Sequence, residues 1–300
     1  MINNLNVLVA APIINVQLIL DGVLIGAIYA LAAYGLALVW GVMNIKNLAQ
    51  GDFMIMGGYI AFVVYKMGIH PIFGLPVAAA IMFGFGWVVY RLIICRIVDR
   101  DMFTSLLATF GLAIALQQLL NLIFGSEVQT AESGFAIRSF FGGLVTVADI
   151  KLVSFVLTAI LATIVVTFMK YSRMGQAIRA TAQDPRAAKV LGIDTERIYA
   201  FTFALNAAIC SAAGVLISMI WVIQPFFGLA YSIRCFVIVT AAGLGNLPGV
   251  IIAALGLGVV EQLGGFVLGL EFQQGIVVSM LVLVLMVRQI QQMRQRQAVV

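Results

Sequence analysis

Residues 169–197 read MKYSRMGQAIRATAQDPRAAKVLGIDTER and form the longest charged stretch of an otherwise apolar chain. The segment Lys170–Arg197 holds six basic and three acidic residues, out of 17 and 12 in the whole sequence. A segment with this many charges cannot lie in hydrocarbon, yet apolar runs long enough to cross a bilayer flank it on both sides. We therefore expect a loop in water between two membrane spans, and its basic excess predicts that it faces the cytoplasm.

The composition of the rest of the chain predicts an integral membrane protein. Of 300 residues, 63% are hydrophobic and 10% are charged, and the mean hydropathy is +1.12. Soluble domains usually carry about 25% charged residues. The 29 glycines and the absence of period-2 alternation favour helical spans over a β-barrel. We expect residues 1–300 to form a single all-α, polytopic transmembrane domain.

Several classes of function are disfavoured by the residue pattern. The net charge of +5 comes from basic residues at the ends of apolar runs, where they set topology, so no nucleic acid partner is expected. Cys95, Cys210 and Cys235 lie far apart and indicate neither a disulfide framework nor a metal site. No nucleotide-binding glycine motif occurs, so we expect no cofactor and no catalytic residues, and any ATP would be hydrolysed by a partner. The N-terminal residues lack a cleavable signal pattern, so we expect the first span to insert the protein.

The apolar runs predict nine crossings with the N-terminus outside and the C-terminus in the cytoplasm. Thirteen of the 17 basic residues fall on the inner side in this layout, including those of the basic cytoplasmic tail 288–300. Lys66, Arg138, Lys151 and Arg234 fall outside. Eight crossings are the alternative if residues 44–65 or 232–246 are re-entrant. The predicted spans are 18–43, 44–65, 72–94, 103–124, 152–169, 199–223, 232–244, 250–268 and 275–287.

One predicted span begins with polar residues. Gln50 and Asp52 flank Gly51 at the start of the run 44–65. An acid beside a glycine at the edge of a membrane segment suggests a broken or re-entrant helix, which is tolerated where it is buried in protein or lines a cavity. The alternative is a short loop with Asp52 in water.

Polar residues inside the other spans are candidates for a translocation path. Gln117 and Asn121 share a helix face because they are four residues apart. A carboxylate at the position of Glu261 costs about 3 kcal/mol at a helix centre, so it should face protein, water or a neighbouring helix. Helix packing through hydrogen bonds is the more common use of such groups. The path candidates are Gln50, Asp52, Gln117, Asn121, Asn206 and Glu261.

The sequence from Gly243 to Gly249, GLGNLPG, predicts a break in regular structure. Gly245, Asn246, Pro248 and Gly249 are the candidate break residues. Such a break marks discontinuous helices in transporters. An ordinary inner loop between two short helices is the alternative.

The charged segment carries its own helix signals. Met174, Ala177, Ile178 and Thr181 follow the spacing of an amphipathic helix. Asp184 is a good N-cap for a second helix, Pro185–Leu191, which Gly192 would end.

A short helical unit at the inner surface has three possible roles. It could anchor to anionic lipid, it could be an inert connector, or it could dock a soluble partner. The careful capping disfavours a floppy connector, and the small Ala187 and Ala188 suit insertion into a groove. Asp194 can cap the membrane helix that follows.

These residues resemble a known family. Arg186-Ala-Ala-Lys-Val-Leu-Gly192 matches the spacing of the EAAxxxG coupling loop of ABC importer permeases. GQAIRATAQDPRAAKVLGID, LIGAIYALAAYGLALVWGVMNIKNLAQGDFMIMGGYIA and GLGNLPGVIIAALGLGVVE are similar to branched-chain amino acid permeases of the Liv type, over about residues 18–287. Two departures are notable. Arg186 stands where the general motif has Glu, and Gln50 stands where close relatives often have His.

The resemblance implies an inner-membrane permease subunit that moves branched-chain amino acids inward by alternating access. It implies a second, similar permease, two cytoplasmic ATPases and a periplasmic or surface-tethered binding protein. Urea, amides or other amino acids are alternative substrates, and a stand-alone secondary transporter driven by an ion gradient is the rival from another class. The residues that the resemblance assigns to ATPase coupling are Arg179, Asp184, Pro185, Arg186, Ala187, Ala188, Lys189 and Gly192.

Overall fold

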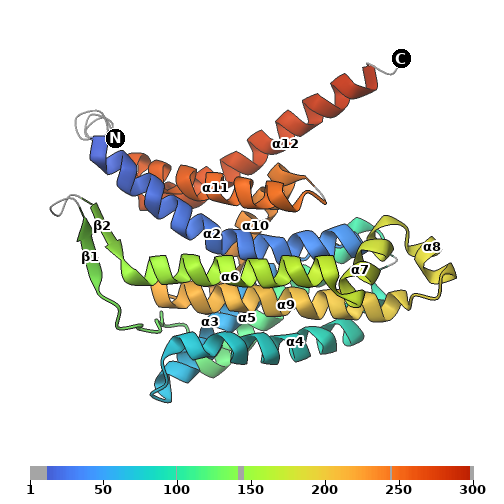
Figure 1. The fold of residues 1–300 in the computed structure, drawn as a ribbon, viewed down its shortest axis with the longest axis horizontal. Helices are drawn as coiled ribbons and strands as arrows, with labels where there is room; N and C mark the ends of the chain where they lie inside the picture. The colour runs from blue at the N-terminus through green and yellow to red at the C-terminus, as the bar shows by residue number, and fades with distance from the viewer. Residues whose placement is uncertain (1–11, 99, 141–144, 244, 298–300) are drawn as a thin grey trace.

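The computed structural model describes residues 12–98, 100–140, 145–243 and 245–297, and it is a helical bundle (Figure 1). Eight helices in this part of the chain are long and apolar enough to cross a membrane, which confirms a polytopic helical membrane protein. The eight spans contain α2 (Pro12–Met43), α4 (Gly74–Leu92), α5 (Met102–Phe124), α6 (Asp149–Tyr171), α9 (Thr195–Ile220), α10 (Gly228–Ala242), α11 (Leu247–Leu268) and α12 (Gln273–Gln297). The shorter helix α3 (Gln50–Lys66) is not one of the eight.

Helix α2 is the centre of the bundle. Nearly all of its residues from Leu24 onward are buried, as expected for a helix that is apolar on every side. It packs against α11, α9, α6 and α10. At Gly22 and Gly26 it lies so close to the backbone of α11 that an added Cβ would collide with Val259 or Ala254. These glycines therefore set the distance between the two helices.

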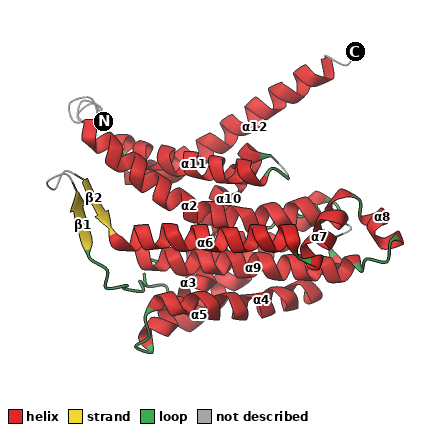
Figure 2. Ribbon diagram, in the orientation of Figure 1, coloured by secondary structure: helices red, strands yellow, loops and turns green. Residues whose placement is uncertain are grey.

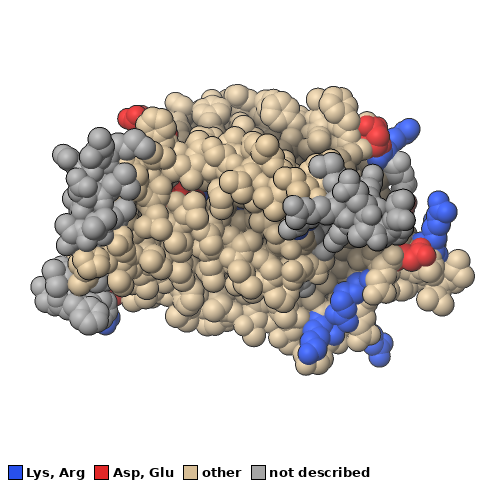
Figure 3. All heavy atoms as spheres, turned by 90° about the horizontal axis from the view of Figure 1, so that it is seen from above, with Lys and Arg blue, Asp and Glu red and all other residues tan. Residues whose placement is uncertain are grey.

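Two short helices lie at one end of the bundle. They are α7 (Arg173–Gln183) and α8 (Pro185–Val190), between α6 and α9. Seen from above (Figure 3), Lys and Arg side chains gather at this end, and the broad middle of the visible surface carries few charges. This distribution matches an apolar band that crosses the bilayer with polar material at its ends.

The opposite end carries a β-hairpin that the sequence pattern did not predict (Figure 2). Strand β1 (Ile137–Phe140) pairs antiparallel with β2 (Val145–Ala148), with Ile137 opposite Ala148. Arg138 forms an ion pair with Asp149, the first residue of α6 (Nε to Oδ1 2.7 Å). The polar stretch predicted as a loop between α5 and α6 is therefore partly ordered as strand.

One predicted helix start was wrong. The helix predicted at 232–244 begins at Gly228, after a 3₁₀ turn at Pro225–Phe227, so Arg234, counted above with the outer charges, lies inside α10 and not at its end. The tail predicted from residue 288 is helical as far as Gln297, because α12 continues past its apolar half. Figure 1 shows α12 running away from the rest of the bundle. Residues 298–300 of the predicted tail lie outside the described ranges. Residues 1–11, on which the expectation of no cleavable signal rests, also lie outside them.

Candidate functional site

The loop formed by α7 and α8 is closed by caps at each of its joints. The Ser172 side chain accepts a hydrogen bond from the Gly175 amide (2.9 Å) at the start of α7. Asp184 Oδ1 accepts from the amides of Arg186 (2.8 Å) and Ala187 (3.0 Å) at the start of α8. The predicted cap at Asp184 is confirmed, and each such cap stabilises its helix by about 1 kcal/mol.

The far end of α8 is closed by the predicted glycine. Gly192 has a φ of 84°, a left-handed conformation that favours glycine. Asp194 Oδ1 then accepts from the Arg197 amide (3.1 Å) and caps α9, with Glu196 in the first turn at the positive end of the helix dipole. The loop therefore has no unstructured joint between α6 and α9.

Helix α7 is fixed to the end of α6. Ile178 and Thr181 are buried on the predicted apolar face. The Arg179 guanidinium donates hydrogen bonds to the backbone carbonyls of Met169 and Lys170 in the last turn of α6. A cation at a helix C-terminus also interacts favourably with the helix dipole. Arg179 therefore holds the loop to the end of α6.

The exposed face of α8 differs from the one expected. Ala188 is only 2% exposed and packs against its own chain, so the expectation that both alanines enter a partner's groove was wrong for Ala188. Val190 and Leu191 are 87% and 80% exposed. Two adjacent apolar residues just before the terminating glycine of a charged loop were the sequence signal for this surface. Arg186, Ala187 and Lys189 are exposed beside them.

A second polar cluster lies at the start of α3. The side-chain amides of Gln50 and Asn206 exchange two hydrogen bonds, Nε2 to Oδ1 at 2.9 Å and Nδ2 to Oε1 at 3.0 Å. Gln50 Nε2 also donates to the backbone carbonyl of Ala32 (2.9 Å). Both amides are fully buried. This cluster joins α3, α9 and α2 at one level of the bundle.

That level is close to the middle of the membrane. Ala32 lies midway along the helix between Asp21 and Met43, the last residue of α2. From the helical rise of about 1.5 Å per residue, it is about 16 Å from either position, or roughly half the thickness of a bilayer core. Asp21 marks the end of this stretch away from α7 and α8, where it pairs with Lys151 (2.7 Å). Helix α3 therefore begins inside the bundle.

The chain reaches this level through a non-helical segment, residues 44–49. Asn44, with a φ of 54°, ends α2 and reverses the chain. Thr109 Oγ1 lies 3.2 Å from both the Leu48 amide and the Lys46 carbonyl. Ser232 Oγ accepts from the Gly51 amide (2.8 Å) and donates to the Leu48 carbonyl (2.6 Å). Side chains of α5 and α10 thus satisfy irregular backbone at membrane depth, which is the condition under which such backbone is tolerated.

Asp52 is buried and is not in water, so the simple-loop alternative for this segment was wrong. Its Oδ1 accepts a hydrogen bond from Gln117 Nε2 (3.0 Å), and its Oδ2 has no partner among the residues that the structure describes. Gly228 packs against the carboxylate so closely that a Cβ there would collide with it. Asn121 is half-buried one turn beyond Gln117, and no side-chain hydrogen bond joins it to this cluster within the described ranges.

Glu261 forms an ion pair with Arg234. Arg234 Nε lies 3.1 Å from both carboxylate oxygens, and its Nη2 also donates to Glu261. The two side chains are 11% and 4% exposed. The rings of Tyr29 and Tyr231 lie 5.6 and 5.4 Å from the guanidinium. The sequence leaves open whether Glu261 faces protein, water or a neighbouring helix. In the structure its carboxylate bonds to Arg234 of the neighbouring helix α10.

The predicted break is a turn between two separate helices. The chain from Arg234 to Asn246 is nearly as long as the chain from Asn246 to Glu261. The contact between Arg234 and Glu261 therefore shows that α10 and α11 pack as an antiparallel hairpin. Asn246 Oδ1 accepts from the Gly249 amide (3.1 Å) and caps α11, with Pro248 in its first turn. Gly245 has a φ of 79°. Gly245 and Asn246 lie in an ordinary turn, Pro248 and Gly249 lie in the first turn of α11, and irregular backbone inside the bundle is found instead at residues 44–49.

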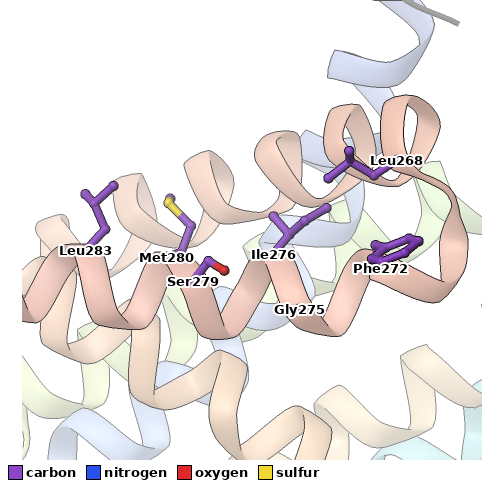
Figure 4. A pocket seen from close by; sticks show the side chains of 7 residues that line it. All are labelled: Leu268, Phe272, Gly275, Ile276, Ser279, Met280 and Leu283. Atoms are coloured by element: carbon purple, nitrogen blue, oxygen red, sulfur yellow. The ribbon is translucent and has the colours of Figure 1, made fainter. Parts of the chain in front are cut away.

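Hollows of ligand size also lie among the residues that the structure describes, and two of them are lined mainly by apolar side chains. One, of about 420 Å³, lies between α11 and the first half of α12 and is lined by Leu268, Phe272, Gly275, Ile276, Ser279, Met280 and Leu283 (Figure 4). The other, of about 290 Å³, lies between α2, α6 and α11. Within the described part of the chain, no group of three or more His, Cys, Asp or Glu side chains is placed to hold a metal ion.

Known proteins resemble the chain over most of its length. A family described as the permease component of branched-chain amino acid transport systems matches residues 18–287. The high-affinity branched-chain amino acid transport system permease protein LivH of Salmonella typhimurium is 31% identical over 285 residues, covering 90% of this chain and 92% of LivH. LivM of the same organism is 28% identical over 266 residues, covering 79% of this chain and 61% of LivM.

A solved structure shares the fold. PsaBC from Streptococcus pneumoniae in complex with Fab superposes with a TM-score of 0.50 at 12% identity, covering 96% of this chain and 95% of that chain. At this identity the likeness concerns only the arrangement of helices.

Proposed function

The chain belongs to the family of permease components of branched-chain amino acid transport systems, and on this premise we propose that it is a membrane subunit of an ABC importer. It is a transport subunit and not an enzyme. In this proposal it moves a branched-chain or related small amino acid inward by alternating access, driven by ATP hydrolysis in partner subunits. It holds no cofactor of its own, and the basic end with α7 and α8 lies in the cytoplasm.

The proposed complex contains a second, homologous permease. The chain resembles both LivH and LivM of one organism, each named as a permease protein of the same transport system. Two related permeases in one system support a pair of similar subunits around the path. Two cytoplasmic ATP-binding subunits and a substrate-binding protein on the outer side complete the proposal, with membrane lipid around the bundle.

The exposed end of α8 is the observation that carries the proposal. Val190 and Leu191 present apolar surface outside the membrane band, where a single chain would not normally expose it. Arg186 and Lys189 frame this surface with positive charge, so the facing patch on an ATPase should be apolar with an acidic rim. Arg186 in place of the family's acid supports an altered polar contact.

The construction of the loop supports the transmission of movement. Its joints are capped and Arg179 ties it to α6, so a displacement of α8 is passed to α6 and α9 with little lost in bending. ATP binding would change the relative populations of inward-open and outward-open states by favouring one position of α8.

The mid-membrane cluster around Gln50 and Asn206 is the proposed path region. It lies where the non-helical segment 44–49 meets the start of α3 inside the bundle, and transporters commonly hold substrate where irregular backbone meets a helix end; its groups must separate for solute to reach them. Asp52 and Gln117 belong to the same level. Glu261 is already paired with Arg234, so we assign it to helix packing.

Substitution of the α8 surface tests the proposal. Ala188→Arg is unsuitable because Ala188 is buried in its own chain. Leu191→Glu removes the apolar contact at an exposed position, and Ile137→Glu, at a position 73% exposed on β1 at the other end, is the matched control. The wild type and the control should retain two ATPases and the second permease on affinity purification from native membranes, whereas Leu191→Glu should lose the ATPases.

Two outcomes would overturn this assignment. Retention of the ATPases by Leu191→Glu at the level of the control would remove α8 as the docking element. Amino acid uptake by the purified chain alone, dependent on an ion gradient, would establish a secondary transporter. Uptake assays of the intact system with leucine, urea and acetamide in competition would separate the substrate classes.

A further inference from the structure

The cavity between α2, α6 and α11 is lined almost entirely by apolar side chains. Its volume is about 290 Å³, near the lower limit for a small-molecule site. Small residues on both walls, including Ala30 and Ala162, leave the space open. The other lining residues are Ala27, Leu31, Tyr34, Phe155, Thr158, Ala159, Thr163, Val166, Ile251 and Leu255.

Two hydroxyl groups in this lining lack partners. Tyr34 is 6% exposed and Thr158 is 4% exposed, and neither hydroxyl has a hydrogen-bond partner within the described ranges of the chain. Leaving a buried hydroxyl unpaired is unfavourable, so native structures rarely do it without a reason. The other hydroxyl of the lining, on Thr163, is satisfied by the Ala159 carbonyl (2.7 Å). The two orphaned groups therefore point to an occupant that can form hydrogen bonds.

The lining also excludes a class of occupant. No lining residue described by the structure is charged, and burial of an unpaired carboxylate or ammonium group is strongly unfavourable. A zwitterionic amino acid would bring both charges into this cavity, so the cavity is not suited to the transported amino acid. An uncharged molecule with an aliphatic body and a single hydroxyl or carbonyl group matches both features.

The position of the cavity indicates where such a molecule comes from. One wall is α6, whose outer face exposes Val156, Ile160 and Ile164 by 50% or more. These aliphatic side chains belong to a helix that is long and apolar enough to span the bilayer. A molecule dissolved in the membrane is therefore the occupant that this position favours.

We propose that the α2–α6–α11 cavity binds an uncharged aliphatic alcohol or carbonyl compound from the bilayer, with Tyr34 and Thr158 pairing its polar group. The site does not depend on the transport assignment, since the argument uses only the cavity, its lining and the apolar outer face of α6.

Photolabelling of the full chain in lipid nanodiscs tests the site. An octanol that carries an aliphatic diazirine should label residues 27–34 and 155–166, as mapped by mass spectrometry. Unlabelled octanol should compete more strongly than octane, because only octanol offers a hydrogen bond. In the isosteric variant Tyr34→Phe/Thr158→Val the advantage of octanol over octane should fall by about 5-fold.

Cavity filling supplies the second measurement. Ala162→Phe should abolish the labelling, whereas Ile160→Phe, half-exposed on the same helix and outside the lining, should leave it unchanged. If Ala162→Phe does not fold, the isosteric variant decides alone. Equal competition by octane in the wild type, or an unchanged octanol advantage in the isosteric variant, would overturn the proposal. Labelling spread evenly over the lipid-facing side of α6 would do the same.

Discussion

Replacement of Glu261 by Gln is expected to destabilise the bundle strongly. The substitution keeps the shape of the side chain but leaves the Arg234 guanidinium charged and 11% exposed. Breaking a buried ion pair by removing one partner costs about 3–5 kcal/mol. The rings of Tyr29 and Tyr231 lie within 6 Å of the guanidinium with Glu261 in place, so their contribution is common to the wild type and the variant and cancels in the comparison. The expected loss of unfolding free energy is therefore about 3–5 kcal/mol.

The measurement is the free energy of unfolding of the full chain in a lipid bilayer, for example by steric trapping. A double-mutant cycle with Arg234→Met and Glu261→Leu isolates the pair. The double variant replaces both charges by apolar groups and should lie within about 1 kcal/mol of the wild type. Glu271→Gln is the matched control, because Glu271 is exposed in the turn before α12, and it should change stability by less than about 0.5 kcal/mol.

Two results would refute this reasoning. If the double variant loses as much stability as the two single variants added together, the two side chains are not energetically coupled. If Glu261→Gln unfolds like the wild type and yet abolishes transport, Glu261 serves the translocation path and not helix packing. The second result would return Glu261 to the candidates for the translocation path, a role that its pairing with Arg234 disfavours.

Three further predictions concern other parts of the chain. Gln50→Leu should lower stability by about 1–3 kcal/mol, since it leaves the buried amide of Asn206 unpaired; bilayer unfolding measures this, and an unchanged stability contradicts it. An impermeant maleimide should label Cys95, which is exposed while the other two cysteines are buried, in inside-out vesicles and not in intact spheroplasts; the reverse pattern would invert the proposed orientation. Thr104 donates side-chain and backbone hydrogen bonds that hold the pKa of the Asp101 carboxyl below its usual value. The stabilisation from this cap is therefore complete above about pH 4 and is lost as the pH falls through the lower pKa of the folded state. Thr104→Val should raise the pKa of Asp101 in a carbon NMR titration, and no rise would contradict the assignment.

The elements that sequence alone could predict are those with a strong local signal. The spans follow from apolar runs, and the caps of the α7–α8 loop follow from Asp184 and Gly192, whose side-chain and backbone chemistry act within a few residues. The amphipathic face of α7 was predicted from spacing alone, and Ile178 is buried as expected.

The misplaced features depend on contacts between distant residues. From the sequence, Arg234 is counted as an outer charge, because its partner Glu261 is 27 residues away. Ala188 is read as a docking residue until the fold turns it toward its own chain. The partnership of Gln50 with Asn206 crosses 156 residues, and neither position signals the other. Long-range pairing of this kind is invisible to a window of the sequence.

The non-helical segment before α3 has a consequence for how the protein is made. Its backbone depends on Thr109 and on Ser232, and the hydrogen bond from Gly51 to Ser232 spans 181 residues. When only the first two spans have left the ribosome, the hydroxyl groups of Thr109 and Ser232 have not yet been inserted, and lipid cannot form these hydrogen bonds in their place. The start of α3 must therefore wait in the translocon or at the membrane surface until α10 emerges, so insertion of this chain cannot proceed strictly one helix at a time.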